Sequence, residues 1–302
     1  MAVKMKREAR KHLLDFALED FVEFCKEKGL AQASITTYEE KILMFTEYAG
    51  QMYVEDLTDE FVLDFRYWLK NNRHFNEVSS NTVYRCINIF LQFCADKYRI
   101  TAFKIPFVKE YKKIKPIFDD EDIKRLTRKP NIEDCNYSEL RDYICTVISL
   151  NTGARASSIV NVHKQDIDMK NKTITFRHAK NRRQFTIPVP KSVIDSIRWY
   201  LEIVDIEDVM FLNSLNEPLT AKQLSVSFRR YCINRGVKLT SYHTLRHWFA
   251  THLMMECQNI HLVSKALGHA NVSTTERYLS TLGINSYSNT LKEIDLTRGL
   301  KG

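Results

Sequence analysis

The first hundred residues contain almost no glycine or proline, and this strongly limits what the chain can fold into. The first proline is Pro106, and only Gly29 and Gly50 precede it among the glycines. Over the whole chain, 8 glycines and 6 prolines in 302 residues lie below the usual shares of about 7% and about 5%. Because turns depend heavily on these two residue types, a long segment without them is expected to be helical.

Apolar residues recur at helical spacing in this segment and predict a bundle of four helices over residues 10–98. In the first helix Leu14, Ala17 and Phe21 share a face, and Gly29 lies where a C-terminal glycine would end the helix. Three further helices are expected over about residues 35–48, 59–71 and 81–97, with Ser34, Thr58 and Ser80 as their N-caps.

Residues 99–115 interrupt this pattern and are predicted to link two domains. Pro106 and Pro116 exclude a continuous helix, and the segment has six basic residues against one acid, Glu110. A solvated connector and a strap along a phosphate backbone explain such charge equally well. The basic residues are Arg99, Lys104, Lys109, Lys112, Lys113 and Lys115.

Residues 116–302 are predicted to form a second, mostly helical domain with one β-hairpin. Residues 173–176 and 185–189 alternate in hydropathy with period two on either side of a basic loop. Pro188 cannot donate to a β-ladder, which places the second strand at a sheet edge. Helices are expected over residues 119–126, 138–150, 191–201, 221–234, 243–256 and 260–267.

Charge and composition favour a globular protein with a polyanionic partner. Lys and Arg number 45 against 37 Asp and Glu, so the net charge is +8. Hydrophobic residues at 44% and charged residues at 27% exclude a disordered or fibrous chain. The uncharged runs are shorter than the roughly 20 apolar residues of a membrane span, and the basic start lacks the apolar core of a secretory signal. With seven scattered cysteines and no CxxC pair, a cytoplasmic protein is expected.

Three motifs contain residue types suited to catalysis. TGARASSI presents Arg155 at a turn between two helices, and YHTLRH places His243 and Arg246 three residues apart on one helical face. LGHANVSTTERY has His269 after a glycine and Tyr278 nine residues later. Each motif alone has an ordinary structural explanation, such as an arginine capping a helix or a packed histidine.

His243 and His247 also have the spacing of a zinc-binding helix. Thr244, however, stands where a metalloprotease has its catalytic Glu, and no cysteine pair completes a site. A zinc site is therefore not expected.

In combination the motifs supply the groups needed for a phosphodiester transfer. Two arginines can bind the non-bridging oxygens of a phosphate as charge builds up in the transition state. A tyrosine hydroxyl can act as a covalent nucleophile. Lys180, in the hairpin loop, can donate a proton to the departing sugar oxygen, and His243 can transfer protons at the same centre.

In order and spacing these motifs resemble those of the tyrosine recombinases, which include phage integrases and Xer-type recombinases. The resemblance spans nearly the whole chain. It implies an N-terminal SAM-like core-binding bundle and a C-terminal α+β catalytic domain. The active-site residues that it implies are the phosphate-binding arginines Arg155 and Arg246, the general acid Lys180, the histidines His243 and His269, and the nucleophile Tyr278.

The resemblance also implies how such a protein works. Four protomers act on two double-stranded DNA sites, each protomer clamps a duplex between its domains, and strands are exchanged through 3′-phosphotyrosine links and a Holliday junction. Neither a metal nor ATP is required, and DNA-bending proteins would be accessory partners. Residues 284–296 would dock on a neighbouring protomer. The expected DNA contacts are Lys104, Lys109, Lys112, Lys113, Lys115, Arg177, Arg182 and Arg183.

One position departs from the family pattern, because Ser158 stands where the family usually has Glu or Asp. A serine can accept or donate a hydrogen bond but supplies no charge. Two alternatives remain open at this point: a DNA-binding protein that has lost catalysis, and a type IB topoisomerase, which uses similar tyrosine chemistry.

Overall fold

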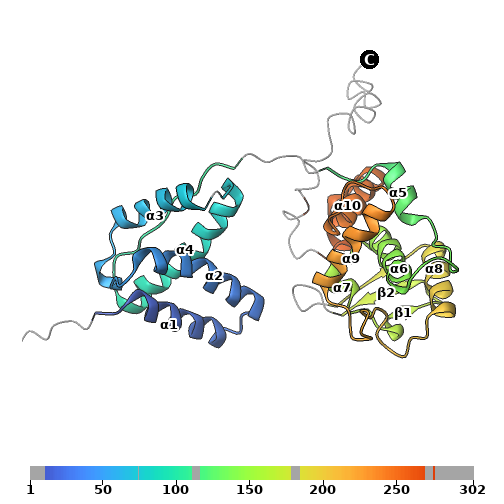
Figure 1. Ribbon diagram of the computed structural model, residues 1–302, viewed down its shortest axis with the longest axis horizontal. Helices are drawn as coiled ribbons and strands as arrows, with labels where there is room; N and C mark the ends of the chain where they lie inside the picture. Colours follow the sequence, from blue (N-terminus) through green and yellow to red (C-terminus); the bar gives the residue numbers. More distant parts are fainter. Residues whose placement is uncertain (1–10, 74, 111–115, 178–183, 269–274, 276–302) are drawn as a thin grey trace, which may run out of the picture. The chain divides into compact units, whose positions relative to one another are not determined.

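The structure, a computed structural model, describes residues 11–73, 75–110, 116–177, 184–268 and residue 275 (Figure 1). The chain divides into two compact units, Met1–Lys112 and Lys113–Gly302. No helix in these described parts is long and apolar enough to cross a membrane. All seven cysteines are free thiols.

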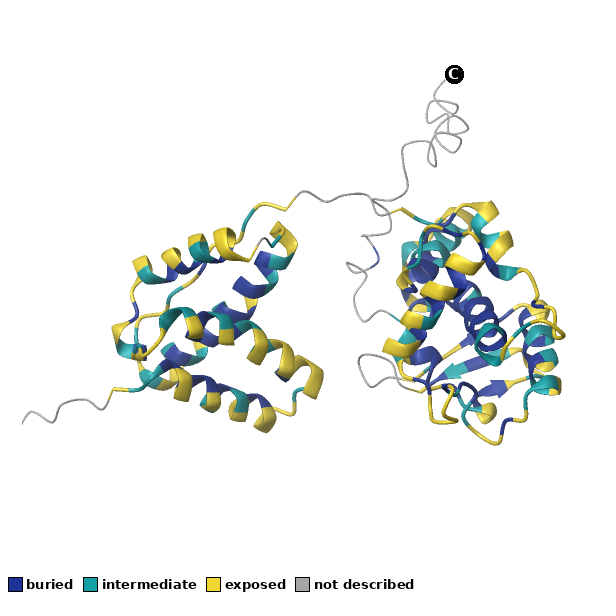
Figure 2. Ribbon diagram, in the orientation of Figure 1, coloured by how far each residue is buried: buried dark blue, intermediate teal, exposed yellow. Residues whose placement is uncertain are grey.

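The N-terminal unit contains the four predicted helices. They are α1 (Leu14–Glu27), α2 (Gln32–Ala49), α3 (Asp59–Asn72) and α4 (Glu77–Tyr98), with a short 3₁₀ turn η1 (Val54–Asp56) before α3. Aromatic side chains fill the core, where Phe21 meets Phe90 edge to face and Phe45 meets Phe65 in the same way. Figure 2 shows the buried residues in dark blue along the helix faces that pack together.

The starts of these helices agree with the sequence prediction in one case and differ in two. Thr58 caps α3 by accepting a hydrogen bond from the Phe61 amide. Asn76, not Ser80, caps α4 by accepting from the Ser79 amide, because Asn is at least as good a cap as Ser and extends the helix by a full turn. Helix α2 begins directly after Ala31 without a side-chain cap, so Ser34 lies inside the helix.

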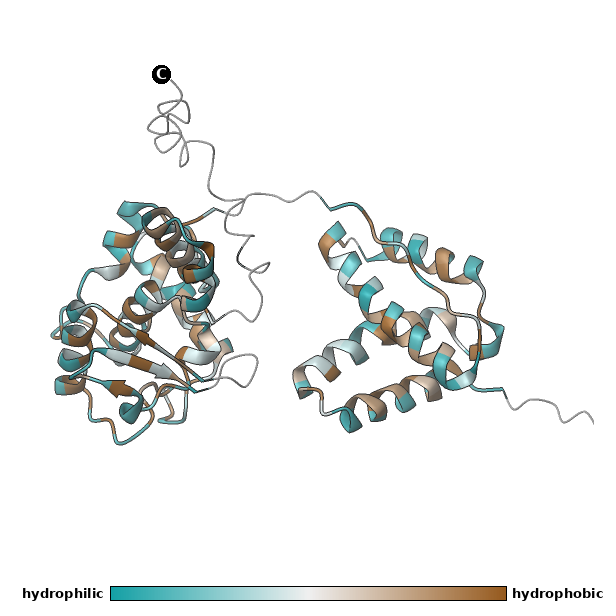
Figure 3. Cartoon of the chain, turned by 180° about the vertical axis from the view of Figure 1, so that it is seen from behind, coloured by the Kyte–Doolittle hydropathy of each residue, from teal (hydrophilic) through white to brown (hydrophobic). Residues whose placement is uncertain are grey.

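Residues 99–110, the first part of the expected linker, pack against the bundle. Ile105 is fully buried in its core, and Phe103 and Val108 pack beside it. Figure 3 shows this extended segment running beside the helices, with hydrophobic residues along it. The apolar residues of the segment therefore make it part of the N-terminal unit, although its charges and prolines favoured a connector.

The C-terminal unit packs its helices around α6 (Tyr137–Thr152), which is buried along most of its length. Such an evenly buried helix needs mostly apolar residues all round, and α6 has them from Tyr143 to Leu150, where only Thr146 and Ser149 are polar. The surrounding helices are α5 (Asp120–Thr127), α7 (Ala156–Ile159), α8 (Lys191–Ile203), α9 (Ala221–Asn234), α10 (His243–Cys257) and α11 (Ile260–Ala266).

A small antiparallel sheet completes this unit. Its strands are β1 (Ile167–Asp168), β2 (Thr173–Phe176) and β3 (Phe185–Pro188), in the order β1-β2-β3, and Ile174 pairs with Ile187. Strand β3 lies at an edge, as Pro188 predicted. Strand β1 has two residues, too few for a period-two pattern, and was not predicted. The fold is therefore the expected one, mainly helical with a small antiparallel sheet.

Candidate active site

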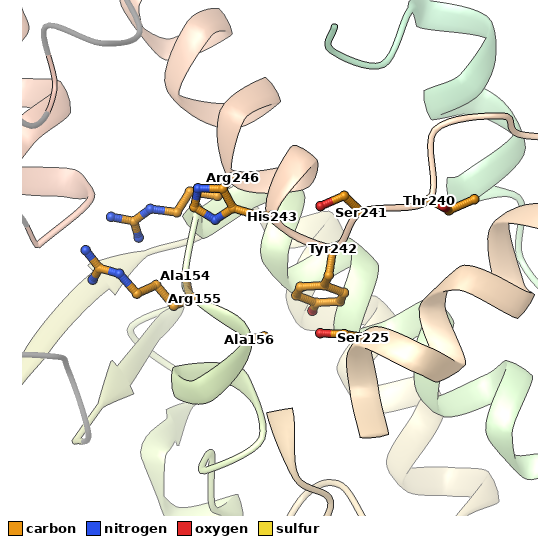
Figure 4. A pocket seen from close by; sticks show the side chains of 9 residues that line it. All are labelled: Ala154, Arg155, Ala156, Ser225, Thr240, Ser241, Tyr242, His243 and Arg246. Atoms are coloured by element: carbon orange, nitrogen blue, oxygen red, sulfur yellow. The ribbon is translucent and has the colours of Figure 1, made fainter. Parts of the chain in front are cut away.

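A cavity of about 220 Å³ lies where the turn after α6 meets α9 and the start of α10 (Figure 4). It brings together Arg155, His243 and Arg246, three of the predicted active-site residues. Arg155 and Arg246 point to the same side of the cavity in Figure 4, with His243 beside Arg246. The remaining lining residues are Ala154, Ala156, Ser225, Thr240, Ser241 and Tyr242.

Gly153 makes the turn that presents Arg155. It ends α6 with φ of +62°, a left-handed conformation that favours glycine. A Cβ atom at this position would lie 2.3 Å from the Phe249 ring, so a larger residue would also collide with α10. The turn places Arg155 in extended conformation at the start of α7. Its side chain is partly exposed and has no hydrogen bond or ion pair with the described residues, so it does not cap the preceding helix.

Arg246, unlike Arg155, is buried and held by backbone carbonyls. Its side chain lies in the interior, with the residue only 2% exposed. Its Nη1 donates to the Gly153 carbonyl at 2.7 Å, and its Nη2 donates to the Leu267 carbonyl at 2.9 Å. These carbonyls lie at the C-terminal ends of α6 and α11, where the negative ends of the helix dipoles favour a cation. The guanidinium is therefore fixed in orientation before any ligand binds.

His243 is the first residue of α10, and the residue before it anchors that helix. The hydroxyl of Tyr242 donates to the Cys145 carbonyl at 3.1 Å and lies 2.6 Å from the Ser149 hydroxyl, both on α6. Burial raises the pKa of Tyr242 well above its ordinary value, so the hydroxyl stays neutral. Tyr242 was not among the predicted site residues, although it is the first residue of the YHTLRH motif and directly precedes His243.

A buried polar network attaches α9 to α6 near the cavity. Asp142 accepts from Arg141 and from the Ser227 hydroxyl, and Arg141 also donates to the Leu212 carbonyl. Burial raises the pKa of Asp142, while the Arg141 guanidinium opposes that rise. The network fixes the wall of the cavity that Ser225 lines.

Ser158, at the position where the family usually has an acid, is buried in α7. Its backbone amide donates to the Arg155 carbonyl at 2.8 Å. Any residue except proline would make this backbone contact, so it does not replace the charge that an acid at this position would supply.

Arg177, expected to contact DNA, pairs with an acid at the base of the hairpin. Its Nε donates at 2.5 Å to Asp166, whose side chain is 1% exposed and also accepts from the His163 amide. The pair leaves part of the Arg177 side chain exposed. The other predicted residues of this loop, Lys180, Arg182 and Arg183, lie outside the described residues, as do His269, Tyr278, Lys112, Lys113 and Lys115.

The described residues give no third ligand for the histidine pair considered as a zinc site. The His243 and His247 rings meet edge to face with centroids 4.8 Å apart. Within the ranges that the structure describes, no group of three or more His, Cys, Asp or Glu side chains could hold a metal ion.

Comparison with known proteins identifies the family. Residues 117–282 match the phage integrase family, and residues 17–112 match the phage integrase SAM-like domain. The chain is 28% identical over 274 residues to tyrosine recombinase XerA of Thermococcus kodakarensis, covering 86% of this chain and 89% of that one. It is 27% identical over 268 residues to tyrosine recombinase XerC of Staphylococcus aureus strain JH9, covering 83% and 87%.

Solved structures share the fold. The Tn1549 transposon integrase in complex with a circular intermediate DNA has a TM-score of 0.72 at 16% identity, covering 92% of this chain and 99% of that one. A lambda integrase tetramer bound to a Holliday junction has a TM-score of 0.72 at 15% identity, covering 89% and 78%. The chain therefore belongs to the phage integrase family of tyrosine recombinases, the family that its three motifs predicted.

Proposed function

We propose that this tyrosine recombinase is a site-specific DNA recombinase that holds the scissile phosphate in the cavity of Arg155, His243 and Arg246. The supporting observation is that these three side chains, up to 91 residues apart in sequence, converge on one cavity. Integration or excision of a mobile element, or resolution of dimers, would be the biological outcome. The place of action would be the cytoplasm, on the nucleoid.

The reaction is a transfer between two oxygen nucleophiles. The Tyr278 oxygen attacks the phosphorus as its proton passes to an active-site histidine, a 3′-phosphotyrosine bond forms, and the bond to the 5′-oxygen breaks. Lys180 gives that oxygen its proton, and the free 5′-hydroxyl of the partner strand later reverses the step. Since one phosphodiester bond replaces another, no ATP is consumed, and we propose that no metal is needed.

The two arginines stabilise the charge that builds up on the non-bridging oxygens. Arg246 is suited to this because its two carbonyl partners fix its plane before the DNA arrives. Arg155 is suited because its donors have no partner among the described residues. His243 and His269 would donate to the same oxygens or transfer protons there.

Assembly follows the same proposal. Four protomers would act on two DNA sites and exchange strands through a Holliday junction. A solved structure of lambda integrase contains a tetramer bound to such a junction. Residues 284–296 would dock on the neighbouring protomer, and DNA-bending proteins would assist. The basic residues Lys104, Lys109, Lys112, Lys113, Lys115, Arg177, Arg182 and Arg183 would contact the DNA backbone.

Covalent trapping tests the proposal and finds the target at the same time. A library of nicked duplexes with a randomised central sequence is incubated with the protein, and DNA that stays attached in denaturant is sequenced. Cleavage near the nick produces a short fragment that carries the 5′-hydroxyl. Because this fragment dissociates, it cannot reverse the reaction, and the adduct accumulates. Mass spectrometry should place the DNA on Tyr278.

The matched variant is Tyr278→Phe, which loses only the nucleophilic oxygen. We expect it to bind the selected duplex and to form no adduct. An adduct on another residue, or one that persists in this variant, would contradict the assignment. Relaxation of a plasmid without two-site exchange would favour topoisomerase activity instead.

A further inference from the structure

The helices of the N-terminal unit are acidic, although the proposed function requires this unit to bind DNA. Residues 11–98 contain nine Lys and Arg against fifteen Asp and Glu, a net charge of −6. Helix α1 and the end of α4 form a pocket of about 390 Å³ whose acids are Asp20, Glu23, Glu27 and Asp96. This face repels a phosphate backbone. DNA must therefore approach the unit by a surface where basic residues are concentrated.

The segment of residues 103–110, called the strap below, lies along α4 and is attached by two asparagines. Asn88 accepts from the Ile105 amide at 2.7 Å and donates to the Ile105 carbonyl at 2.9 Å. Asn81 accepts from the Val108 amide at 2.8 Å and donates to the Val108 carbonyl at 2.8 Å. Each side-chain amide thus pairs with both polar groups of one residue, as a neighbouring β-strand would.

The spacing of the two asparagines matches the spacing of the two residues they hold. Asn81 and Asn88 are seven residues apart on a helix, a rise of about 10.5 Å. Ile105 and Val108 are three residues apart in an extended chain, a span of about 10 Å. Pro106, between them, has no amide hydrogen and so needs no partner. Because Asn81 is buried and Ile105 lies fully in the core, the strap is a fixed element.

The fixed strap presents a small basic surface. Lys104 and Lys109 are exposed on it, and Phe107 is 48% exposed. The guanidinium of Arg85, one turn from Asn81 on α4, lies over the Phe107 ring at 5.7 Å from its centroid. The acid of the strap, Glu110, accepts a hydrogen bond from Asn81 at 2.7 Å and is drawn toward α4.

We propose that Asn81 and Asn88 are positioning residues that hold the strap as a preformed binding surface for a DNA backbone. Arg85, Lys104 and Lys109 bind the phosphates, and the face of the Phe107 ring holds the Arg85 guanidinium in position. The inference rests on the proposed function, because DNA is the ligand. A strap ordered in advance does not lose chain entropy on binding, which favours affinity without any additional charge.

The test separates preorganisation from charge. Binding of the full chain to a mixed-sequence duplex is measured at several salt concentrations. The variant Asn81→Ala/Asn88→Ala keeps the net charge, so we expect weaker binding and a salt slope shallower by about one to two, since each lost phosphate contact changes it by about 0.9. Gln92→Ala, an exposed amide on the same helix, is the control and should leave both unchanged.

A coupling experiment sharpens this test. Arg85→Ala should reduce the salt slope by about 0.9 in the otherwise unchanged protein. In the double asparagine variant the same substitution should have little effect, because the strap is no longer held beside Arg85. Equal effects in both backgrounds would overturn the proposal.

Amide hydrogen exchange at Ile105 and Val108 shows whether the double substitution has released the strap from α4. Faster exchange with unchanged affinity and salt slope would overturn the DNA role of the strap. Unchanged exchange would show that the two asparagines do not hold the strap in place. If the double variant does not fold, Asn88→Ala alone, at a half-buried position, replaces it. Adduct formation at saturating protein is the separate test of the proposed function: the asparagine variants should retain it, and Tyr278→Phe should lose it with a normal salt slope.

Discussion

The turn after α6 and the start of α10 each bring one arginine to the same cavity, but they hold it differently. Arg155 is partly exposed and has no polar partner among the described residues, while Arg246 is buried and fixed by two backbone carbonyls. The difference indicates a division of work. We propose that Arg246 sets the position of the phosphate and that Arg155 adjusts to it.

The substitution Arg246→Ala should have the largest effect, because it should lower both the free energy of unfolding and the rate of cleavage. It leaves the carbonyls of Gly153 and Leu267 without a buried donor, so we expect a loss of about 2 to 6 kcal/mol in the free energy of unfolding. Cleavage should fall by about 10³-fold or more, since a transition-state donor is lost as well. Urea unfolding and single-turnover cleavage of the selected duplex measure the two effects. Full stability in this variant would show that the carbonyl contacts contribute nothing.

The substitution Arg155→Ala should separate activity from stability. We expect cleavage to fall by about 10² to 10³-fold, with the free energy of unfolding within about 0.5 kcal/mol of the original protein. The same two assays apply. Arg198→Ala, another exposed arginine of this unit, is the control and should leave cleavage unchanged. Strong destabilisation by Arg155→Ala would indicate a structural role for this side chain.

The substitution Tyr242→Phe should have the smallest effect. It removes the hydroxyl that links α10 to Cys145 and Ser149, so we expect a loss of about 1 kcal/mol in the free energy of unfolding. Cleavage should fall by about tenfold or less, because His243 and Arg246 shift slightly. Tyr67→Phe, at a residue 69% exposed, is the control and should change neither.

The pH dependence gives a second measurement on the same variant. Burial raises the pKa of Tyr242, so the folded protein keeps this proton at a pH where the unfolded chain, with a pKa of about 10, has lost it. The free energy of unfolding therefore falls as the pH rises above about 10. Tyr242→Phe should reduce the steepness of that fall. An unchanged pH profile would contradict the burial of the hydroxyl.

The elements that could be predicted from the sequence are those set by local signals. Helix α9 has the bounds predicted for it, and in the structure Thr220 and Gln223 form the capping box that begins it, a local signal. Two of the three motifs likewise predicted residues that line the cavity, Arg155 in TGARASSI and His243 and Arg246 in YHTLRH, since each motif is a short run of characteristic residue types. The fold class and the family could be predicted for the same reason.

The features that escaped prediction depend on contacts distant in sequence. The Tyr242 hydroxyl meets residues on α6 that lie 93 and 97 positions earlier, and the strap is held by asparagines 17 and 27 positions before their partners. No local pattern records such pairs. The charge of residues 99–115 was noticed, but the two asparagines that fix its first part look ordinary within an amphipathic helix.

We propose that Arg155 and Arg246 bind one phosphate together. A double-mutant cycle of single-turnover cleavage tests it most directly, using Arg155→Lys, Arg246→Lys and both substitutions, since lysine keeps the charge and loses the bidentate geometry. We predict that the double variant is little slower than the slower single variant, because the two side chains act as one unit on one transition state. Losses that multiply in full would show that the arginines act at independent sites and would contradict the claim.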